Sequence, residues 1–171
     1  MIKKEILEKV LAKATSTGAD FAEIFVEHTR NNSLYFVNSR IEEISDSTVS
    51  GAGIRAFLGC RCVSASTTDL SESGLITCAQ RVADVISESK NEITINLVRS
   101  IPTNIHAIKI VPDTVKKSQK VDLLKAGCFA ALEKSSEIIQ VSGSLSDVDH
   151  EILIANSDGL DWQNVFACES S

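Results

Sequence analysis

Apolar residues near the N-terminus recur at intervals of three and four residues, as they do on one face of a helix. The positions are Ile6, Leu7, Val10, Leu11 and Ala14. This spacing predicts an amphipathic helix that begins near Lys3. Gly18 is expected to end it, because glycine readily adopts the left-handed conformation found at many helix ends.

β-branched and aromatic residues dominate the stretch that follows. Two such runs, 24–26 and 34–37, are separated by the polar residues 29–33, which predicts a hairpin between Ala22 and Val37. Two more runs, Val49–Leu58 and Arg61–Ser66, are separated only by Gly59-Cys60, a two-residue hairpin turn with glycine first. We therefore expect four strands after the first helix.

A second helix has the clearest signals. Asp69 is placed to cap it and Glu72 follows three residues later, as in a capping box. Its apolar face is predicted to contain Leu75, Ile76, Ala79, Val82, Ala83 and Ile86.

The middle of the chain is less regular. Ile93, Ile95 and Leu97 alternate as in a strand. Ile108 and Ile110 suggest another short strand before Pro112.

The last third of the chain repeats the order of the first. A third helix is predicted from about Lys116 to Ser135, followed by strands Ile138–Leu145 and Glu151–Asn156. Each half therefore contains a helix followed by strands, and Asn38-Ser39 matches Asn156-Ser157. The fold class is α+β, an antiparallel sheet with packed helices and an approximate internal helix-strand-strand duplication.

Composition and charge narrow the classes of function. The chain has 171 residues, with 23 acidic and 17 basic side chains and a net charge of −6. This balance disfavours nucleic acid and anionic membranes as partners. Charged residues interrupt the N-terminal apolar positions, so the N-terminus lacks the hydrophobic segment of a secretion signal. No apolar run is long enough to span a membrane. The five cysteines are an odd number without a secretion signal, which favours reduced thiols in the cytoplasm.

Two short sequences start like known motifs. Gly51-Ala52-Gly53-Ile54-Arg55-Ala56 matches the glycine fingerprint of dinucleotide-binding folds, but a turn and a strand are expected after it instead of the required helix. His150-Glu151 begins like a helical zinc motif, yet Ile154 and Ala155 stand where its second histidine would be. His28 and His106 are far from it in sequence, so we expect no metal site within this chain.

Three other groups have both an ordinary and a functional interpretation. Cys60 and Cys62 flank one residue and would share a strand face, so they are either hairpin packing residues or part of a regulatory or metal site completed by Cys78 or Cys128. The hydroxyls of the second group lack a nearby histidine base or a nucleophile elbow, and do not support nucleophilic catalysis: Ser64, Ser66, Thr67 and Thr68. The lysines of the third helix are expected to form its solvated face, with a phosphate site as the alternative: Lys116, Lys117, Lys120 and Lys125.

Several segments together resemble the N-terminal domain of the TldD/PmbA family. They are Gly18-Ala19-Asp20 with Ala22-Glu23, Ile41-Glu42-Glu43-Ile44, Gly51-x-Gly53-Ile54-Arg55, Ala65-Ser66-Thr67-Thr68-Asp69-Leu70 and Asn156-Ser157-Asp158-Gly159-Leu160. The family was once described as modulators of DNA gyrase and is regarded as zinc metallopeptidases. The resemblance covers residues 1–166.

The resemblance implies that the catalytic part lies elsewhere. Family members are two to three times longer, and their peptidase subunits carry a His-Glu-x-x-x-His zinc helix and a further cysteine ligand in the C-terminal half. We expect residues 1–166 to be the N-terminal domain and 167–171 the start of a missing C-terminal region, so that the chain is a fragment. No catalytic or metal residue transfers to this chain, and its substrate-binding residues are unknown.

The resemblance also implies a function. The chain is expected to be the substrate-cleft and dimerisation domain of a cytoplasmic zinc metallopeptidase that acts on unstructured peptides, with the zinc in the missing domain. Its net charge favours basic or neutral peptides. The expected partners are a peptide substrate and a second subunit, either a copy or a family paralogue, with no nucleic acid and no membrane. The alternatives are a non-catalytic partner subunit and a free-standing binding domain.

Overall fold

The computed structural model describes residues 2–86, 94–100 and 108–170, with side chains described as far as Asp161. Two compact units are present. Unit 1 contains residues 1–28, 50–103 and 151–165, and unit 2 contains residues 29–49, 104–150 and 166–171.

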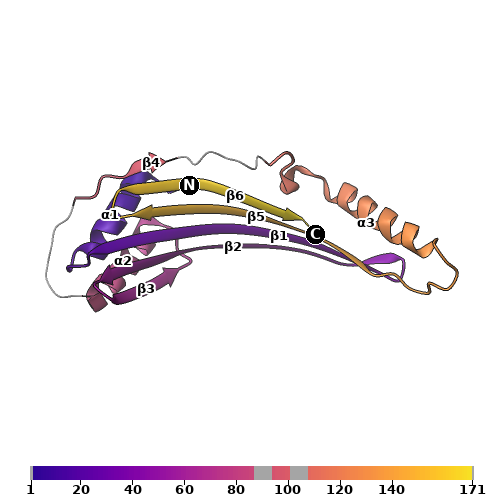
Figure 1. Cartoon of the computed structure of the whole chain (residues 1–171), viewed down its shortest axis with the longest axis horizontal. Coiled ribbons are helices and arrows are strands. Elements are labelled where there is room, and N and C mark those ends of the chain that lie inside the picture. Colours follow the sequence, from indigo (N-terminus) through magenta and orange to yellow (C-terminus); the bar gives the residue numbers. More distant parts are fainter. Residues whose placement is uncertain (1, 87–93, 101–107, 171) are drawn as a thin grey trace. The chain divides into compact units, whose positions relative to one another are not determined.

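Helices and runs of strands follow one another along the chain as in an α+β protein, with three consecutive strands between the first two helices (Figure 1). The helices are α1 (Lys4–Thr15), α2 (Glu72–Ile86) and α3 (Lys117–Leu132), with a short 3-10 helix, η1, at Pro112–Thr114. The strands are β1 (Phe21–Val37), β2 (Arg40–Leu58), β3 (Arg61–Thr67), β4 (Val98–Ser100), β5 (Gly143–Asn156) and β6 (Leu160–Ser170). They form a six-stranded sheet in the order β3-β2-β1-β5-β6-β4. β2 and β3 are antiparallel, whereas β4 runs parallel to β6. The predicted α+β class is confirmed, and the internal duplication stays a prediction.

The hairpin predicted between Ala22 and Val37 is wrong, because β1 is a single strand. Its polar residues have partners that keep them in the strand: Arg30 donates to Asp113 at 2.9 Å, and Asn32 donates to Asp147 at 2.9 Å. The chain turns instead at Asn38-Ser39, where both residues have positive φ, 51° and 62°. Such a pair forms a tight hairpin turn that matches the strand twist. Three strands, not four, therefore lie between α1 and α2.

The two strands predicted at Ile138–Leu145 and Glu151–Asn156 are also wrong in number. Residues 138–142 have no regular structure, and 143–156 form the single strand β5. The polar residues in the middle of β5 have the sequence pattern of a loop, but side chains of unit 2 provide them with hydrogen-bond partners. Asp147 accepts a hydrogen bond from Lys120 at 2.8 Å, and a hydrogen bond of 3.1 Å joins His150 to Thr29.

The middle of the chain differs from its prediction too. Ile95 and Leu97 are buried, but strand pairing starts only at Val98, and Ile93 lies outside the described residues. Ile108 and Ile110 do not form a strand. Apolar alternation here marks burial, not pairing.

Asp69 is not the cap of α2. Ser71 is, because its hydroxyl accepts the N–H of Gly74 at 3.1 Å, three residues into the helix. Asp69 makes the preceding turn by accepting the N–H of Ser71 at 3.0 Å. The first helix ends at Thr15 with Ser16 as its C-cap, earlier than predicted, whereas Gly18 has the expected left-handed conformation with a φ of 102°.

In unit 1 the core lies between the two N-terminal helices and one face of the sheet. α1 and α2 pack against each other, and α2 also packs against β3. The side chains that they bury include Leu7, Val10 and Leu11 of α1, Leu75, Ala79 and Val82 of α2, and Ile24, Ile54 and Leu153 of the strands. The opposite face of β1, β2 and β3 keeps its side chains at least partly exposed. None of the helices in the described ranges is both long and apolar enough to span a bilayer.

Unit 2 has a smaller core of its own. Leu34 and Phe36 of β1 pack with Leu124 and Cys128 of α3. The ring of Phe129 meets that of Phe36 edge-on, with the centroids 5.6 Å apart. The third helix matches its prediction closely, starting one residue later and ending three residues earlier than expected.

Candidate functional site

β3 is an edge strand whose pairing is fixed by a tight turn. The register runs from Leu58 opposite Arg61 to Ala52 opposite Thr67. Gly59 has a φ of 54° and begins the two-residue turn, as the sequence predicted. In the described part of the sheet, no strand lies beyond β3.

This turn determines which backbone N–H and C=O groups of β3 do not bond to β2. A two-residue turn closes on a hydrogen-bonded pair, here Leu58 and Arg61, and bonded and non-bonded pairs then alternate. The N–H and C=O groups of alternate residues therefore point away from β2: Cys62, Ser64 and Ser66. We call this row the free edge of β3.

The side chains of β3 alternate in the same way. Val63 and Ala65 pack against the core of unit 1. Cys62, Ser64 and Ser66 are exposed on the face that no helix covers. The free edge therefore combines unpaired backbone groups with small side chains, so a second chain could approach closely.

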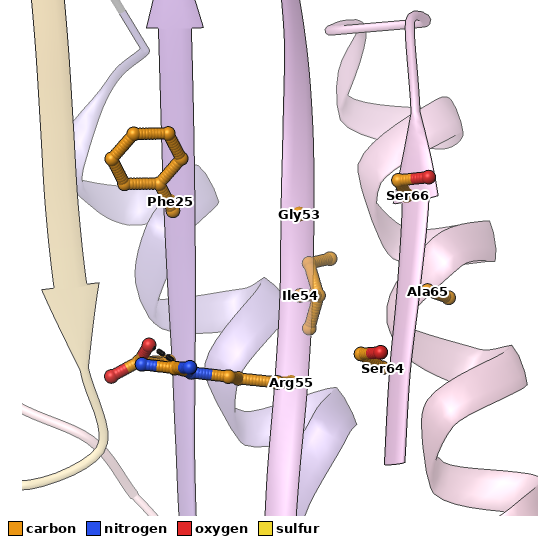
Figure 2. Close-up of a pocket in the computed structure, with 8 residues that line it drawn as sticks. Phe25, Gly53, Ile54, Arg55, Ser64, Ala65 and Ser66 are labelled. Carbon is orange, nitrogen blue, oxygen red and sulfur yellow. Dashed lines mark hydrogen bonds and ion pairs between the residues drawn. The ribbon is translucent and has the colours of Figure 1, made fainter.

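A hollow lies on the same face, beside the free edge (Figure 2). Its volume is about 480 Å³, and it is lined by Glu23 and Phe25 of β1, Gly53, Ile54 and Arg55 of β2, and Ser64, Ala65 and Ser66 of β3. Arg55 spans the strands to form an ion pair with Glu23, and its guanidinium carbon lies 5.7 Å from the centre of the Phe57 ring. The hollow thus has an aromatic wall, a charged wall and a wall of small hydroxyls.

Glycine at position 53 keeps the hollow open. A Cβ built on Gly53 would have no heavy atom within 4 Å, so a side chain there would project into the hollow. Gly51 differs, because a Cβ there would lie 3.3 Å from the carbonyl oxygen of Thr67. Close backbone packing therefore applies to Gly51 and not to Gly53. β2 continues past them as a strand, so the helix N-terminus that a dinucleotide site needs is absent from this segment.

The histidines and cysteines that the structure describes are not brought together as a metal site. His28 shares a hydrogen bond of 2.5 Å with Ser50 in unit 1, and His150 pairs with Thr29 in unit 2. His106 lies outside the described residues. Within the described ranges, no group of three or more His, Cys, Asp or Glu could hold a metal ion.

The expectation that Cys60 and Cys62 share a strand face is wrong, because Cys60 belongs to the turn. Both are exposed, whereas Cys78 and Cys128 are buried, one in each unit. Burial raises the pKa of the Cys78 thiol, and the nearby positive charge of Arg81 opposes this shift.

The lysines of α3 do not all belong to a solvated face. Lys116 and Lys117 are exposed, and Lys117 pairs with Asp46. Lys120 is mostly buried and forms an ion pair with the buried Asp147. This cation stabilises unit 2 and is not presented to a phosphate.

Sequence reasoning missed the free edge and the hollow, although the signals for them are present. Ser64 and Ser66 alternate with Val63 and Ala65, a pattern of one polar and one apolar face. The position of β3 at the edge is set by the order of the sheet, which the sequence pattern does not contain.

Two family models match the chain, one after the other. The model described as PmbA/TldA metallopeptidase domain 1 matches residues 22–96. The model described as the PmbA/TldA metallopeptidase central domain matches residues 110–165. A search of curated proteins found no match.

Solved structures share the fold at low sequence identity. A proposed modulator of DNA gyrase from Bacteroides thetaiotaomicron is 18% identical with a TM-score of 0.68, over 99% of this chain and 40% of that one. A second from Thermotoga maritima is 18% identical with a TM-score of 0.71, over 98% and 37%. TldE from Thermococcus kodakarensis is 20% identical with a TM-score of 0.60, over 96% and 37%. The chain thus spans about two fifths of the length of these proteins.

Proposed function

Because the chain belongs to the PmbA/TldD metallopeptidase family, we propose that it is the substrate-cleft and dimerisation part of a peptidase that acts on unstructured peptides. The free edge of β3 is the observation that supports this role. An extended peptide can add to such an edge as another strand, and its backbone supplies most of the affinity with little demand on sequence.

The hollow would complete the recognition. A peptide strand on the free edge would turn every second side chain toward the face that carries the hollow. Ser64 and Ser66 are small, so they would let a long side chain reach over β3 toward Gly53. Phe25 and Arg55 offer this side chain apolar and polar contacts.

The zinc of the peptidase would be bound outside this chain, in the remaining part of a longer protein. The described residues contain no group of ligands that fits it, so no catalytic step is assigned to them. We place the protein in the cytoplasm, where the four free cysteines of the described residues would stay reduced.

A proline at position 64 tests the docking of a peptide. The N–H of Ser64 points away from β2, so Ser64→Pro should remove a donor from the free edge and leave the pairing with β2 intact. Ser64→Thr is the matched control, because it also changes the side chain but keeps the N–H.

The measurement is the binding of a fluorescent, unstructured peptide, together with urea unfolding of each variant. We expect Ser64→Pro to weaken binding at least about tenfold at nearly unchanged stability, and Ser64→Thr to bind like the original chain. Equal binding by all three proteins would refute the proposal.

The dimerisation role rests on large apolar side chains that unit 2 exposes. Leu123 is 67% exposed and Ile139 is 96% exposed. Exposed apolar side chains that form one patch are typical of protein interfaces. Light scattering should give a dimer mass for the chain, alone or mixed with a family paralogue, and Leu123→Glu should shift it toward the monomer. A monomer mass under both conditions would exclude this role.

The same recognition role would suit a non-catalytic partner subunit. The sequence that follows Ser171 in the parent gene discriminates the two, since a peptidase subunit should contain the His-Glu-x-x-x-His zinc motif there.

A further inference from the structure

One flank of α2 runs beside the free edge of β3. Arg61, at the start of β3, donates a hydrogen bond to the carbonyl of Val85 at 3.4 Å. Thr67, at the end of β3, lines a groove together with Cys78 and Arg81. The helix flank from Cys78 through Arg81 to Val85 therefore follows β3 in the opposite direction.

The other flank of α2 faces α1. Glu72 accepts a hydrogen bond from Lys9 of α1 at 2.6 Å, and the carbonyl of Ala83 accepts one from Thr17, just after α1, at 2.5 Å. The flank with Arg81 is thus turned away from α1 and toward β3.

The groove at the end of β3 is polar and open. Its volume is about 240 Å³, and its lining residues are Thr67, Asp69, Ser73, Gly74, Thr77, Cys78 and Arg81. Thr77 already donates its hydroxyl proton to the carbonyl of Ser73 at 2.8 Å, so the hydroxyls of Thr67 and Ser73 and the Arg81 guanidinium remain to donate hydrogen bonds to a group that enters it.

Arg81 is the positive charge of this groove, and its guanidinium has no ion-pair partner among the described residues. Asp84, one turn further along α2, accepts a hydrogen bond from Gln80 instead. An exposed arginine in a groove lined by hydroxyls is suited to bind a carboxylate through two parallel hydrogen bonds.

The one acidic residue of the groove is engaged at its other end. The Asp69 carboxylate accepts hydrogen bonds from Ser71 and lies over Gly74, where a Cβ would come within 2.3 Å of its carboxyl carbon. Gly74 and Arg81 are seven residues apart, about 10 Å along the helix axis. None of the ion pairs among the described residues joins Asp69 to Arg81, so the guanidinium can attract an anion.

We propose that Arg81 binds a carboxylate of the peptide that lies along the free edge of β3, and so selects acidic peptides at one position. This inference rests on the proposed function. A strand paired with β3 would turn alternate side chains toward α2, and the groove would receive one of them, or the end of the peptide. The net charge of the whole chain favours basic or neutral peptides, whereas the local charge beside β3 favours an acidic one.

A scan of peptides tests the preference. Short peptides of Ser, Thr and Val, each carrying a single Glu at a different position, are compared with the same peptides carrying Gln, with free and with amidated C-termini. We expect Glu at one position, or a free C-terminus, to tighten binding about threefold to fivefold, and salt to weaken this gain.

Two arginine variants show which residue causes the gain in affinity. Arg81→Gln should abolish the gain, whereas Arg61→Gln, which removes the same charge from the other end of β3, should keep it. A gain lost on amidation identifies the C-terminal carboxylate as the ligand, and a gain that follows Glu identifies a side chain.

The outcomes separate this inference from the proposed function. Peptides that bind with no charge preference, or with the same preference after Arg81→Gln, would overturn the role of Arg81 alone. Binding that Ser64→Pro does not weaken would overturn the docking of a peptide on β3, and with it both proposals.

Discussion

Nζ of Lys120 lies 2.8 Å from Oδ2 of Asp147, and these side chains are only 11% and 3% exposed. The second carboxylate oxygen accepts a hydrogen bond from Asn32 at 2.9 Å. One carboxylate therefore joins α3 and β1 to β5. Its charge is tolerated in unit 2 because both oxygens have partners.

Removing the charge of Asp147 should destabilise the protein strongly. Asp147→Asn leaves the Lys120 ammonium with little solvent and no ionic partner, so we expect the free energy of unfolding in urea to fall by about 3 kcal/mol. Asp46→Asn is the matched control, since it breaks the exposed pair with Lys117 and should cost less than about 1 kcal/mol. Similar losses in the two variants would contradict the interpretation.

Gly143 begins β5 at a point where α3 leaves no room for a side chain. A Cβ there would lie 2.7 Å from Sγ of Cys128 and 3.2 Å from Cδ1 of Leu124. Gly143→Ala should lower the free energy of unfolding by about 1 to 3 kcal/mol, because the small core of unit 2 must shift.

A double mutant separates this contact from a general effect of alanine. In the Gly143→Ala/Cys128→Ala protein the crowding sulfur is gone, so the total loss should be smaller than the sum of the two single losses. Strict additivity in urea titrations would show that the sulfur is not the obstacle.

Asp69 should make stability depend on acidic pH. Hydrogen bonds from the hydroxyl and the backbone N–H of Ser71 hold the pKa of this carboxyl below its ordinary value. The folded state therefore binds a proton less readily than the unfolded state. This contribution to stability is present above about pH 4 and is lost as the pH falls through the pKa of the folded state.

The measurement compares the unfolding free energy of the original chain and of Asp69→Asn from pH 6 to pH 2. The difference between the two proteins should shrink as the pH falls. A constant difference over the whole range would mean that Asp69 has the same pKa in both states.

Local signals in the sequence predicted the elements that depend on neighbouring residues. The helical spacing that starts at Ile6 and the glycine-first turn at Gly59 are both present in the structure. In each case the interactions that form the element join residues close together along the chain, so the local sequence pattern is enough to predict it.

The failures involve polar residues whose partners are distant in sequence. Asn32 and Asp147 looked like loop residues, yet they bond to each other across 115 positions and keep β1 and β5 continuous. Tertiary partners of this kind allow a polar residue in a long strand, and a local pattern does not reveal them.

In the candidate site, too, some features follow from the local sequence and others depend on tertiary structure. The small, alternating residues of β3 could be read from the sequence, but the order of the sheet that makes β3 an edge could not. Arg81 had no signal in the sequence, because its role depends on the flank of α2 that faces the free edge.

The two glycines of β2 provide a final test of the hollow. Gly53→Val should leave the free energy of unfolding unchanged or raise it slightly, because its Cβ meets no atom and valine favours a strand. Gly51→Val should lower it by about 1 to 2 kcal/mol, since its Cβ would crowd the carbonyl of Thr67, a backbone group that cannot rotate away. If a peptide side chain occupies the hollow, Gly53→Val should also weaken the binding of peptides with large side chains and spare those with alanine at the same position. Equal losses of stability in both variants would mean that the hollow is not the open space that position 53 faces.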